Sequence, residues 1–364
     1  MPDTAPPFRR CHVFIPYSET AAGLESPYYH DDGVRADIAS WFAGRPLDWD
    51  WIPVTARNLA GAVGNALDAG PAGETVVVNL CDGDDCNGYP GLSVVQALAA
   101  AGVPFTGAGT SFYALSTSKL AMKRRFAAAG VHTAPWQAIV DPESDLRRAA
   151  EAVSYPMFIK PDVAAAAAGL SSASVVHDHG EALAQVRRLL GGMHGFRIAP
   201  GGLFAESFLP GREFSLLVIA DAAAPGGVVG FAPCERLFHA SLPPEQRFVT
   251  YERSSGEYLE DTAPPDGGDS YRYAPVEPRL VPRLQRTAQA AFAALDGTGY
   301  GRVDLREDRD GGLAVLEVNA NCGLSASDLS TVGAILAFSG TTMAVLLDMM
   351  LRDAWRRHSM GERS

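Results

Sequence analysis

The stretch from Gly299 to Gly323, GYGRVDLREDRDGGLAVLEVNANCG, decides the fold of the carboxyl-terminal part of this chain. Apolar and polar residues alternate on both sides of its centre, which predicts two strands, because successive side chains of a strand point to opposite faces of a sheet. Between them, Asp308-Arg309-Asp310-Gly311 is a strong signal for a tight turn. The stretch therefore predicts a β-hairpin.

The register of this hairpin can be predicted by parity. A turn of even length pairs even-numbered with odd-numbered residues and sorts the side chains onto one polar and one apolar face. A slip of one residue would mix the two faces. The predicted polar face holds Arg302, Asp304, Glu317 and Asn319, and the apolar face holds Val303, Leu305, Leu316 and Val318.

The polar face has the composition of a magnesium site. Two carboxylates and an amide oxygen are hard ligands, and Mg²⁺ keeps its remaining positions for water and phosphate oxygens. Arg302 beside them suits an anionic group. The alternative is a solvent-facing hairpin with ordinary surface charges, and the hairpin alone does not decide between the two.

Two lysines upstream suggest an anionic ligand. Lys160 ends a predicted apolar strand directly before a proline, and Lys119 lies in the first turn of a helix predicted to be capped by Ser116 and to reach Ala129. A cation at a helix start opposes the helix dipole, so Lys119 favours an anionic partner. Taken singly, each lysine could equally be a surface residue whose ammonium reaches water.

The segment FAESFLPGREF, residues 204–214, reads as two strands around a Pro-Gly turn. Glu206 and Glu213 are carboxylates within these otherwise apolar strands. A nucleotide fits this pattern, because linker backbone can bind a purine and a carboxylate can bind ribose hydroxyls. The alternative is a pair of exposed strand positions.

The rest of the chain indicates the fold class of the amino-terminal part and disfavours several kinds of partner. Short apolar strands at residues 12–16 and 75–80, followed by small-residue helical segments, predict a parallel α/β lobe. A net charge of −12 over 364 residues disfavours non-specific binding of nucleic acid. The five cysteines include no Cys-x-x-Cys pair, so we expect neither a structural zinc site nor a disulfide framework. With no signal-peptide or membrane-span pattern, we expect a soluble cytoplasmic protein.

The order of these motifs resembles the ATP-grasp superfamily, and within it the D-alanine–D-alanine ligase family. The order is a lysine in a helix, Lys-Pro after a strand, Glu-x-x-x-x-Gly-x-Glu, Gly-Arg-x-Asp and Glu-x-Asn, and the resemblance covers about Val76 to the carboxyl terminus. It implies an α/β chain with α+β character in its carboxyl-terminal lobes. The implied domains are an amino-terminal α/β domain (1–110), a central ATP-grasp subdomain (111–200) and a carboxyl-terminal subdomain with the magnesium and catalytic site (201–364).

The resemblance also implies a role for individual residues. Lys119 and Lys160 correspond to nucleotide-binding lysines, Glu206, Ser207 and Leu209 to the adenine segment, and Glu213 to the ribose-binding glutamate. Asp304, Glu317 and Asn319 correspond to the ligands of two Mg²⁺ ions, for which Mn²⁺ can substitute. Arg302 and the Gly323 amide correspond to the groups that stabilise a tetrahedral oxyanion.

The sequence departs from the family where amino-acid substrates bind. It has no Gly-Gly-x-Ser-x-Glu motif near its first strand, and Glu19 is an unsupported substitute. The family's two serines after Lys-Pro are replaced by Ala166 and Ala167 in an alanine-rich loop, and a Lys-Tyr pair is missing near residues 251–255. Loop 162–172, and with it 245–275, are the expected lids. We therefore expect a substrate other than D-alanine.

The expected activity is an ATP-dependent ligation of a carboxylate and an amine through an acyl phosphate, with amino acids as the expected substrates. A homodimer is common in the family. The alternatives are a ligase for a non-peptide carboxylate or another nucleophile, a phosphotransferase, and a protein that binds ATP without turnover. A Rossmann dehydrogenase is disfavoured, because GAGTS at 107–111 holds only the first two glycines of the dinucleotide-binding motif.

Overall fold

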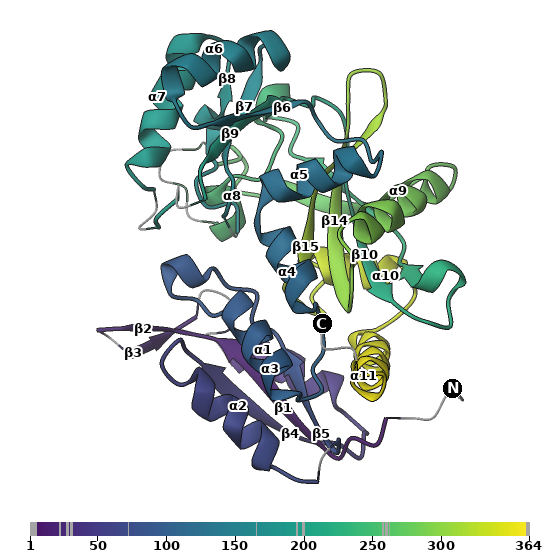
Figure 1. The fold of residues 1–364 in the computed structure, drawn as a ribbon. Helices are drawn as coiled ribbons and strands as arrows, with labels where there is room; N and C mark the ends of the chain where they lie inside the picture. The colour runs from purple at the N-terminus through teal and green to yellow at the C-terminus, as the bar shows by residue number, and fades with distance from the viewer. Residues whose placement is uncertain are drawn as a thin grey trace.

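The computed structural model describes residues 6–21, 23–26, 29, 32–71, 73–164, 166–193, 196–198, 201–256, 258, 261 and 263–361. Figure 1 shows the amino-terminal strands β1, β4 and β5 at the bottom, β6–β9 at the upper left, and β10, β14 and β15 beside them. The combination of a parallel sheet with antiparallel sheets confirms the predicted fold class.

The amino-terminal sheet is parallel, in the order β4-β1-β5. Its inward residues divide between two cores with the period of two that a buried strand dictates. Phe14 and Val77 pack against α2 and α3, whereas Val13 and Val78 pack with residues of α1 and α11. Beyond β5, Phe105 adds a single parallel bridge to Val77. The elements are β1 (Arg10–Pro16), the hairpin β2 (Ser18–Thr20) and β3 (Gly23–Glu25), α1 (Asp32–Trp41), β4 (Asp48–Val54), α2 (Leu59–Asp68), β5 (Thr75–Asn79) and α3 (Leu92–Ala101).

The central sheet is antiparallel, in the order β6-β9-β7-β8. Helices α6 and α7 pack against each other and against this sheet, around a core that includes Leu146, Val186 and Ala205. The sheet places Lys160 and Glu206 on neighbouring strands. Its elements are β6 (Trp136–Ile139), α6 (Pro142–Ala152), β7 (Met157–Pro161), β8 (Val175–Val176), α7 (His179–Leu190) and β9 (Leu203–Ser207).

The largest sheet has six strands, in the order β13-β12-β10-β14-β15 with β11 paired to β10. Helix α9 covers it through the buried residues Leu284, Ala288 and Phe292, which are four residues apart and lie on one face of the helix. The elements are β10 (Glu213–Ala220), β11 (Val228–Gly230), β12 (Cys234–Phe238), α8 (Tyr251–Ser255), β13 (Tyr271–Pro275), α9 (Val281–Ala294), β14 (Tyr300–Glu307), β15 (Leu313–Ala320), α10 (Thr331–Phe338) and α11 (Met343–Ser359).

The predicted hairpin is present as β14 and β15, but its turn is not of even length. Five residues, 308–312, separate Glu307 from its partner Leu313. A bulge after Asp304 then shifts the register by one, so that Asp304 pairs with Glu317. The four predicted polar residues share a face, while Leu316 leaves the main core and packs with Leu209 in a small separate cluster. The predicted face is confirmed and the predicted place of Leu316 is wrong.

Lys119 is positioned by a one-residue interruption between two short helices. The predicted single helix from Ser116 is wrong, because α4 (Thr110–Thr117) ends there and α5 (Lys119–Ala128) begins at Lys119. Ser118 has the extended backbone of a cap, and its Oγ accepts from the Ala121 amide at 3.1 Å. The Ser118 hydroxyl also donates to Asp162, which ties this corner to the end of β7.

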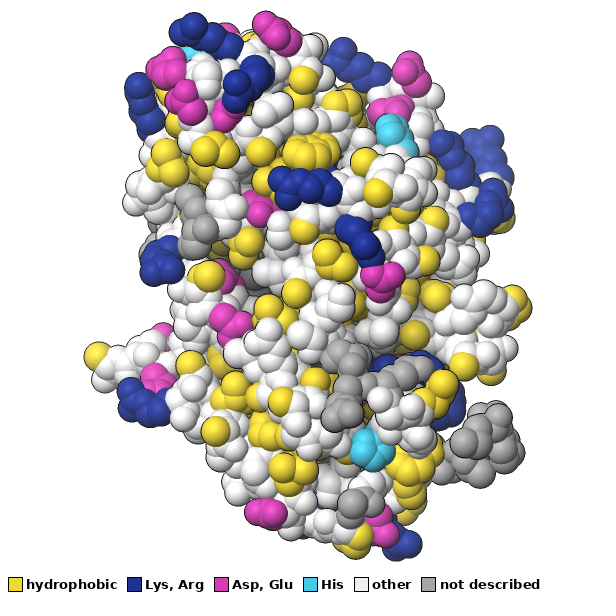
Figure 2. Space-filling view, viewed as in Figure 1, with side chains coloured by type: hydrophobic (Ala, Val, Ile, Leu, Met, Phe, Trp, Pro, Cys, Tyr) yellow, Lys and Arg dark blue, Asp and Glu magenta, His cyan; other side chains and the backbone are white. Residues whose placement is uncertain are grey.

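Among the described residues, no single helix is long and apolar enough to cross a membrane; α10 and α11 meet the length and hydropathy test only as a pair bent by 99°. On the face drawn in Figure 2, acidic and basic side chains are interspersed, most visibly over the upper part of the molecule.

Candidate active site

The paired strands β14 and β15 bring a guanidinium and a carboxylate into direct contact. Arg302 and Asp304 lie two residues apart on β14, and two hydrogen bonds join them, Nε to Oδ1 at 2.9 Å and Nη2 to Oδ2 at 2.8 Å. Ser215 on β10 donates to Asp304 Oδ1 at 2.6 Å. Burial alone would lower the pKa of Arg302, but the charge and hydrogen bonds of Asp304 raise it, so the guanidinium stays charged.

Glu317 and Asn319 on β15 complete the predicted polar face. The Asn319 amide nitrogen donates to Asp304 Oδ2 at 3.0 Å and to Glu317 Oε1 at 3.3 Å. Lys119 Nζ lies 3.2 Å from Glu317 Oε2. Burial raises the pKa of Glu317, but the cations of Lys119, Lys160 and Arg302 outweigh it and lower the pKa to about 2. This carboxylate is therefore ionised at neutral pH next to a lysine.

This donor set fits magnesium as a partner of phosphate. Asp304 and Glu317 supply carboxylate oxygens from directly paired positions, and the Asn319 side-chain amide, whose nitrogen faces both carboxylates, would turn its oxygen toward a bound ion. The described residues contain no group of three or more His, Cys, Asp or Glu side chains that could hold a metal ion alone. Mg²⁺ characteristically uses one or two carboxylates together with water and substrate phosphates, so two carboxylates and an amide are a suitable set.

A triad of two lysines and one glutamate adjoins this face, and two of its members, Lys123 and Glu206, are buried. Glu206 Oε1 lies 2.5 Å from Lys160 Nζ, and Glu206 Oε2 lies 2.6 Å from Lys123 Nζ. Burial raises the pKa of Glu206, but the two ammonium groups outweigh it and lower the pKa to about 2. Lys123 also donates to Thr133 Oγ1 at 2.9 Å. The sequence prediction missed Lys123, although it lies one helical turn after Lys119 on α5.

Glu213 lies between two arginines rather than at an open edge. Arg236 on β12 and Arg306 on β14 occupy the positions directly opposite Glu213 on both sides of β10. Arg306 Nη1 lies 3.0 Å from Glu213 Oε2, and Arg236 forms an ion pair with Oε1. Cross-strand pairing of this kind fixes the carboxylate in the sheet.

The two remaining residues of the predicted adenine segment lie beside the triad. The Ser207 amide donates to the Pro135 carbonyl at 3.0 Å and its hydroxyl donates to the Val153 carbonyl at 3.0 Å. Leu209 is buried and packs with Ala134 and Leu316. These apolar residues lie next to the charged triad of Lys123, Lys160 and Glu206, an arrangement that suits a flat base attached to phosphates.

Gly323 follows β15 and faces a residue that the prediction missed. A Cβ added to Gly323 would lie 3.7 Å from Asp82 Oδ2. Burial raises the pKa of Asp82 to about 7, against lowering contributions from its own backbone amide and from the charge of Arg302. A signal was available, because Asp82 follows strand β5, and ligands of parallel sheets bind beyond the carboxyl ends of the strands.

The alanine-rich loop is described except for residue 165, and the second expected lid, 245–275, except for residues 257, 259, 260 and 262. Ala166 and Ala167 have φ of +52° and +58°, a left-handed conformation that costs a non-glycine residue about 1–2 kcal/mol. Lys119 Nζ donates to the Ala164 carbonyl at 3.3 Å, which joins the loop to the polar face. In α8, the basic side chain of Arg253 turns inward and donates to the Phe248 carbonyl at 3.0 Å.

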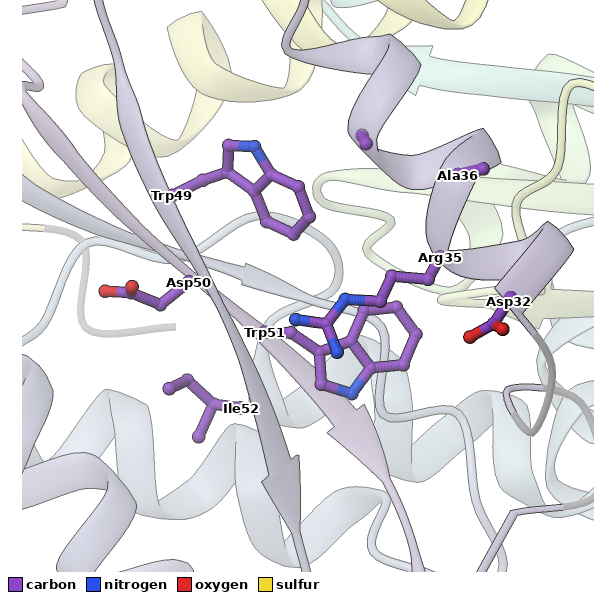
Figure 3. Close-up of a pocket in the computed structure, with 8 residues that line it drawn as sticks. Asp32, Arg35, Ala36, Trp49, Asp50, Trp51 and Ile52 are labelled. Atoms are coloured by element: carbon purple, nitrogen blue, oxygen red, sulfur yellow. The ribbon is translucent and has the colours of Figure 1, made fainter.

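A cavity of about 500 Å³ lies on the amino-terminal sheet and contains none of these residues. Figure 3 shows Arg35 of α1 above the ring of Trp51 of β4, with Asp32 and Asp50 at the sides. It is lined by α1 and by residues 49–52 of β4, whereas Asp82 follows the carboxyl end of β5, so this cavity and the polar face belong to different parts of the molecule.

Known proteins resemble this chain in sequence. A family model described as D-ala D-ala ligase C-terminus matches residues 239–352. The D-alanine–D-alanine ligase of Methylococcus capsulatus is 30% identical over 241 residues, which span 65% of this chain and 67% of that protein. The D-alanine–D-alanine ligase of a Synechococcus species is 28% identical over 258 residues, 70% of this chain and 69% of that protein.

Solved structures share the fold over nearly the whole chain. The VanG D-Ala:D-Ser ligase of Enterococcus faecalis aligns with a TM-score of 0.70 at 16% identity and covers 96% of this chain and 99% of its own. The D-alanine–D-alanine ligase of Bacillus anthracis, solved in complex with ATP, aligns with a TM-score of 0.68 at 16% identity, covering 97% and 99%. The chain therefore belongs to the D-alanine–D-alanine ligase family and is an ATP-grasp carbon–nitrogen ligase of the ADP-forming kind.

Proposed function

We propose that this chain uses ATP and Mg²⁺ to activate an amino-acid carboxylate as an acyl phosphate and joins it to an amine, with a substrate pair other than two D-alanines. The observation that carries the proposal is the shared face of β14 and β15, where Asp304, Glu317 and Asn319 adjoin Arg302 and Lys119. A phosphate-bound metal and a developing oxyanion both need such a face.

Each group has a separate role in this proposal. Asp304, Glu317 and Asn319 would hold Mg²⁺, which neutralises phosphate charge when it is bound. Lys119 and Lys160 bind phosphate oxygens, and Glu206 with the backbone at Ser207 and Leu209 lines the adenine. Glu213 binds the ribose. A ribose hydroxyl must then donate to the Glu213 carboxylate while Arg236 and Arg306 remain paired with it.

The chemistry follows from charge and position. The carboxylate oxygen of the first substrate attacks the γ-phosphate of ATP, ADP leaves, and a mixed anhydride forms. The amine attacks the carbonyl carbon, and inorganic phosphate leaves. Arg302 and the Gly323 amide stabilise the oxyanion between these events, a contribution that typically amounts to about 10²–10³ in kcat for one donor. Loop 162–172 closes over the phosphates and excludes water from the anhydride.

The proposal of a different substrate is supported by the places where this chain departs from the family, which lie outside the predicted ATP-binding residues. Ala166 and Ala167 offer no hydroxyl to a substrate or phosphate, so only their backbone amides can donate there. Helix α8 ends in Ser254-Ser255, and its arginine points inward, so no side-chain cation of this helix is directed outward. Among the structural relatives, VanG is a D-Ala:D-Ser ligase, so that protein uses a second amino acid other than D-alanine on a similar fold.

The test is ADP release from Mg²⁺-ATP, with pools of L-amino acids, D-amino acids and other small carboxylates, and with product masses measured in parallel. We expect pool-dependent ADP and a condensation product of two pool members. ATP binding without ADP release in every pool would contradict the proposal and would favour a nucleotide-binding protein without turnover.

A further inference from the structure

Asp82 lies where three parts of the chain meet. It follows β5 of the amino-terminal sheet, and its Oδ2 lies 3.7 Å from the position of a Cβ on Gly323, beyond the end of β15. Tyr113 of α4 reaches the same loop, because its hydroxyl lies 3.4 Å from the Gly83 carbonyl. The Asp82 carboxylate therefore lies beside one of the two groups assigned to the oxyanion.

Within the described part of the chain, the Asp82 carboxylate has no ion-pair partner. Among the residues that the structure describes, no lysine, arginine or histidine forms an ion pair with it, and the neighbouring Arg302 is engaged by both oxygens of Asp304. Burial raises the pKa of Asp82 to about 7 and also, with a smaller contribution from the Asp82 charge, raises the pKa values of Tyr29, Tyr113 and Tyr300. A recessed carboxylate without a cation favours a cationic ligand.

The loop does not need Asp82 for its own structure. Asp84 accepts from the Cys86 amide at 2.9 Å and caps the following turn. Asp85 accepts from the Gly91 amide at 3.2 Å and from the Ser93 amide at 3.1 Å. These two aspartates hold the loop, and Asp82 is left to face the site.

We propose that Asp82 binds the ammonium group of the amine substrate and accepts its proton before the attack on the acyl phosphate. This inference rests on the proposed ligase function and adds the residue that binds and deprotonates the amine. The position beside Gly323 supports it, because the amide of this residue is assigned to the oxyanion, and the attacking nitrogen and the oxyanion are bonded to the same carbon.

Transfer of one proton from the ammonium to Asp82 frees the nitrogen lone pair, which forms the C–N bond. The C–O bond to phosphate breaks, and the second proton of the attacking nitrogen leaves with inorganic phosphate. Asp82 then returns its proton to solvent. Proton transfer by a positioned side chain typically contributes about 10²–10⁴ in rate.

The experiment separates activation of the carboxylate from attack by the amine. Wild type, Asp82→Asn and the matched control Asp84→Asn are supplied with Mg²⁺-ATP and the amino-acid pools, with and without hydroxylamine. Hydroxylamine is largely neutral at pH 7, so it traps an acyl phosphate as a hydroxamate without needing a counter-ion or a base. In the control variant, the amide oxygen of the new side chain can still accept from the Cys86 backbone, so the control makes the same charge change in the same loop.

We expect Asp82→Asn to form hydroxamate within about threefold of wild type and to lose about 100-fold or more in amide synthesis, the lower end of the contribution from proton transfer. The control should keep both activities within about twofold. Equal amide synthesis in Asp82→Asn and wild type, or an equal loss of hydroxamate and amide, would overturn the role of Asp82 alone. If wild type makes hydroxamate from no pool, the proposed ligase function fails, and this inference fails with it.

Discussion

Replacing Glu206 by glutamine should destabilise the protein far more than replacing either lysine of its triad. The Glu206 side chain is buried, as is Lys123 at 1% exposure, and the carboxylate lies within 2.6 Å of both ammonium nitrogens. The variant Glu206→Gln leaves two ammonium groups around a neutral amide. Breaking a buried ion pair from one side typically costs about 3–5 kcal/mol, because the other charge stays buried without compensation.

The two control variants follow from the same geometry. Lys123→Met puts an apolar side chain of similar length in the buried position and leaves Glu206 paired with Lys160, so we expect a loss of about 1–2 kcal/mol. The double variant Glu206→Gln/Lys123→Met retains only the Lys160 ammonium, whose side chain is 14% exposed and can reach water. The double variant should therefore be more stable than Glu206→Gln by about 2 kcal/mol.

Urea unfolding followed by far-UV circular dichroism measures these differences for wild type and the three variants. Lys123 supplies an independent check, because burial lowers its pKa and removal of Glu206 takes away the opposing contribution. At alkaline pH the unfolded chain then binds more protons than the folded chain, so the free energy of unfolding rises with pH. The difference in this free energy between wild type and Glu206→Gln should therefore shrink as pH rises toward 10.5. A double variant less stable than Glu206→Gln, or a deficit unchanged by pH, would refute the reasoning.

Three further outcomes are expected. Asp304→Asn and Glu317→Gln should each reduce ADP release by about 100-fold or more while the far-UV spectrum stays that of wild type, and full activity in either would remove it from the metal site. Ala166→Ser keeps the left-handed backbone and adds one hydroxyl, so ADP release should stay within about threefold of wild type; an inactive variant that still binds ATP would show steric exclusion by the loop instead. The pKa of Glu206 is about 2 in the folded protein and ordinarily 4.5, so the stabilisation by its carboxylate is complete above pH 4.5 and is lost as pH falls toward 2. The difference in the free energy of unfolding between wild type and Glu206→Gln, measured by urea unfolding, should therefore narrow over that range.

The polar face of the hairpin was predictable because alternation carries most of the information. Its detailed geometry was not, because the turn has five residues and a bulge restores the parity that the turn loses. The extra residue of this bulge is Leu316, an apolar residue among apolar residues, so the alternation of the sequence does not reveal the bulge. Leu316 was therefore assigned to the main core, although it packs with Leu209 beside the predicted adenine segment.

The partners of the charged residues were much harder to predict than the residues themselves. Glu206 and Glu213 stood out as carboxylates in apolar strands, but their cations come from 83, 23 and 93 positions away in the chain for Lys123, Arg236 and Arg306. Such pairs depend on which strands become neighbours, and here β10 lies between β12 and β14. Local patterning identifies a buried carboxylate, whereas the order of strands decides which cation neutralises it.

The position of Asp82 depends on a junction that only the packed structure reveals. Gly107 and Gly299 meet there so closely that a Cβ on Gly299 would overlap the Gly107 carbonyl oxygen, and Asn321 Oδ1 accepts from the Ala108 amide at 2.7 Å. Arg357 of α11 donates to the Gly107 carbonyl at 2.9 Å. Gly107, the first glycine of GAGTS, thus serves a close backbone contact. These contacts join the loop at Gly107 and Ala108 to Gly299 before β14 and to Asn321 after β15. Gly323 lies two residues beyond Asn321, and a Cβ there would lie 3.7 Å from Asp82 Oδ2, so the closeness of Asp82 to Gly323 depends on how two distant parts of the chain pack.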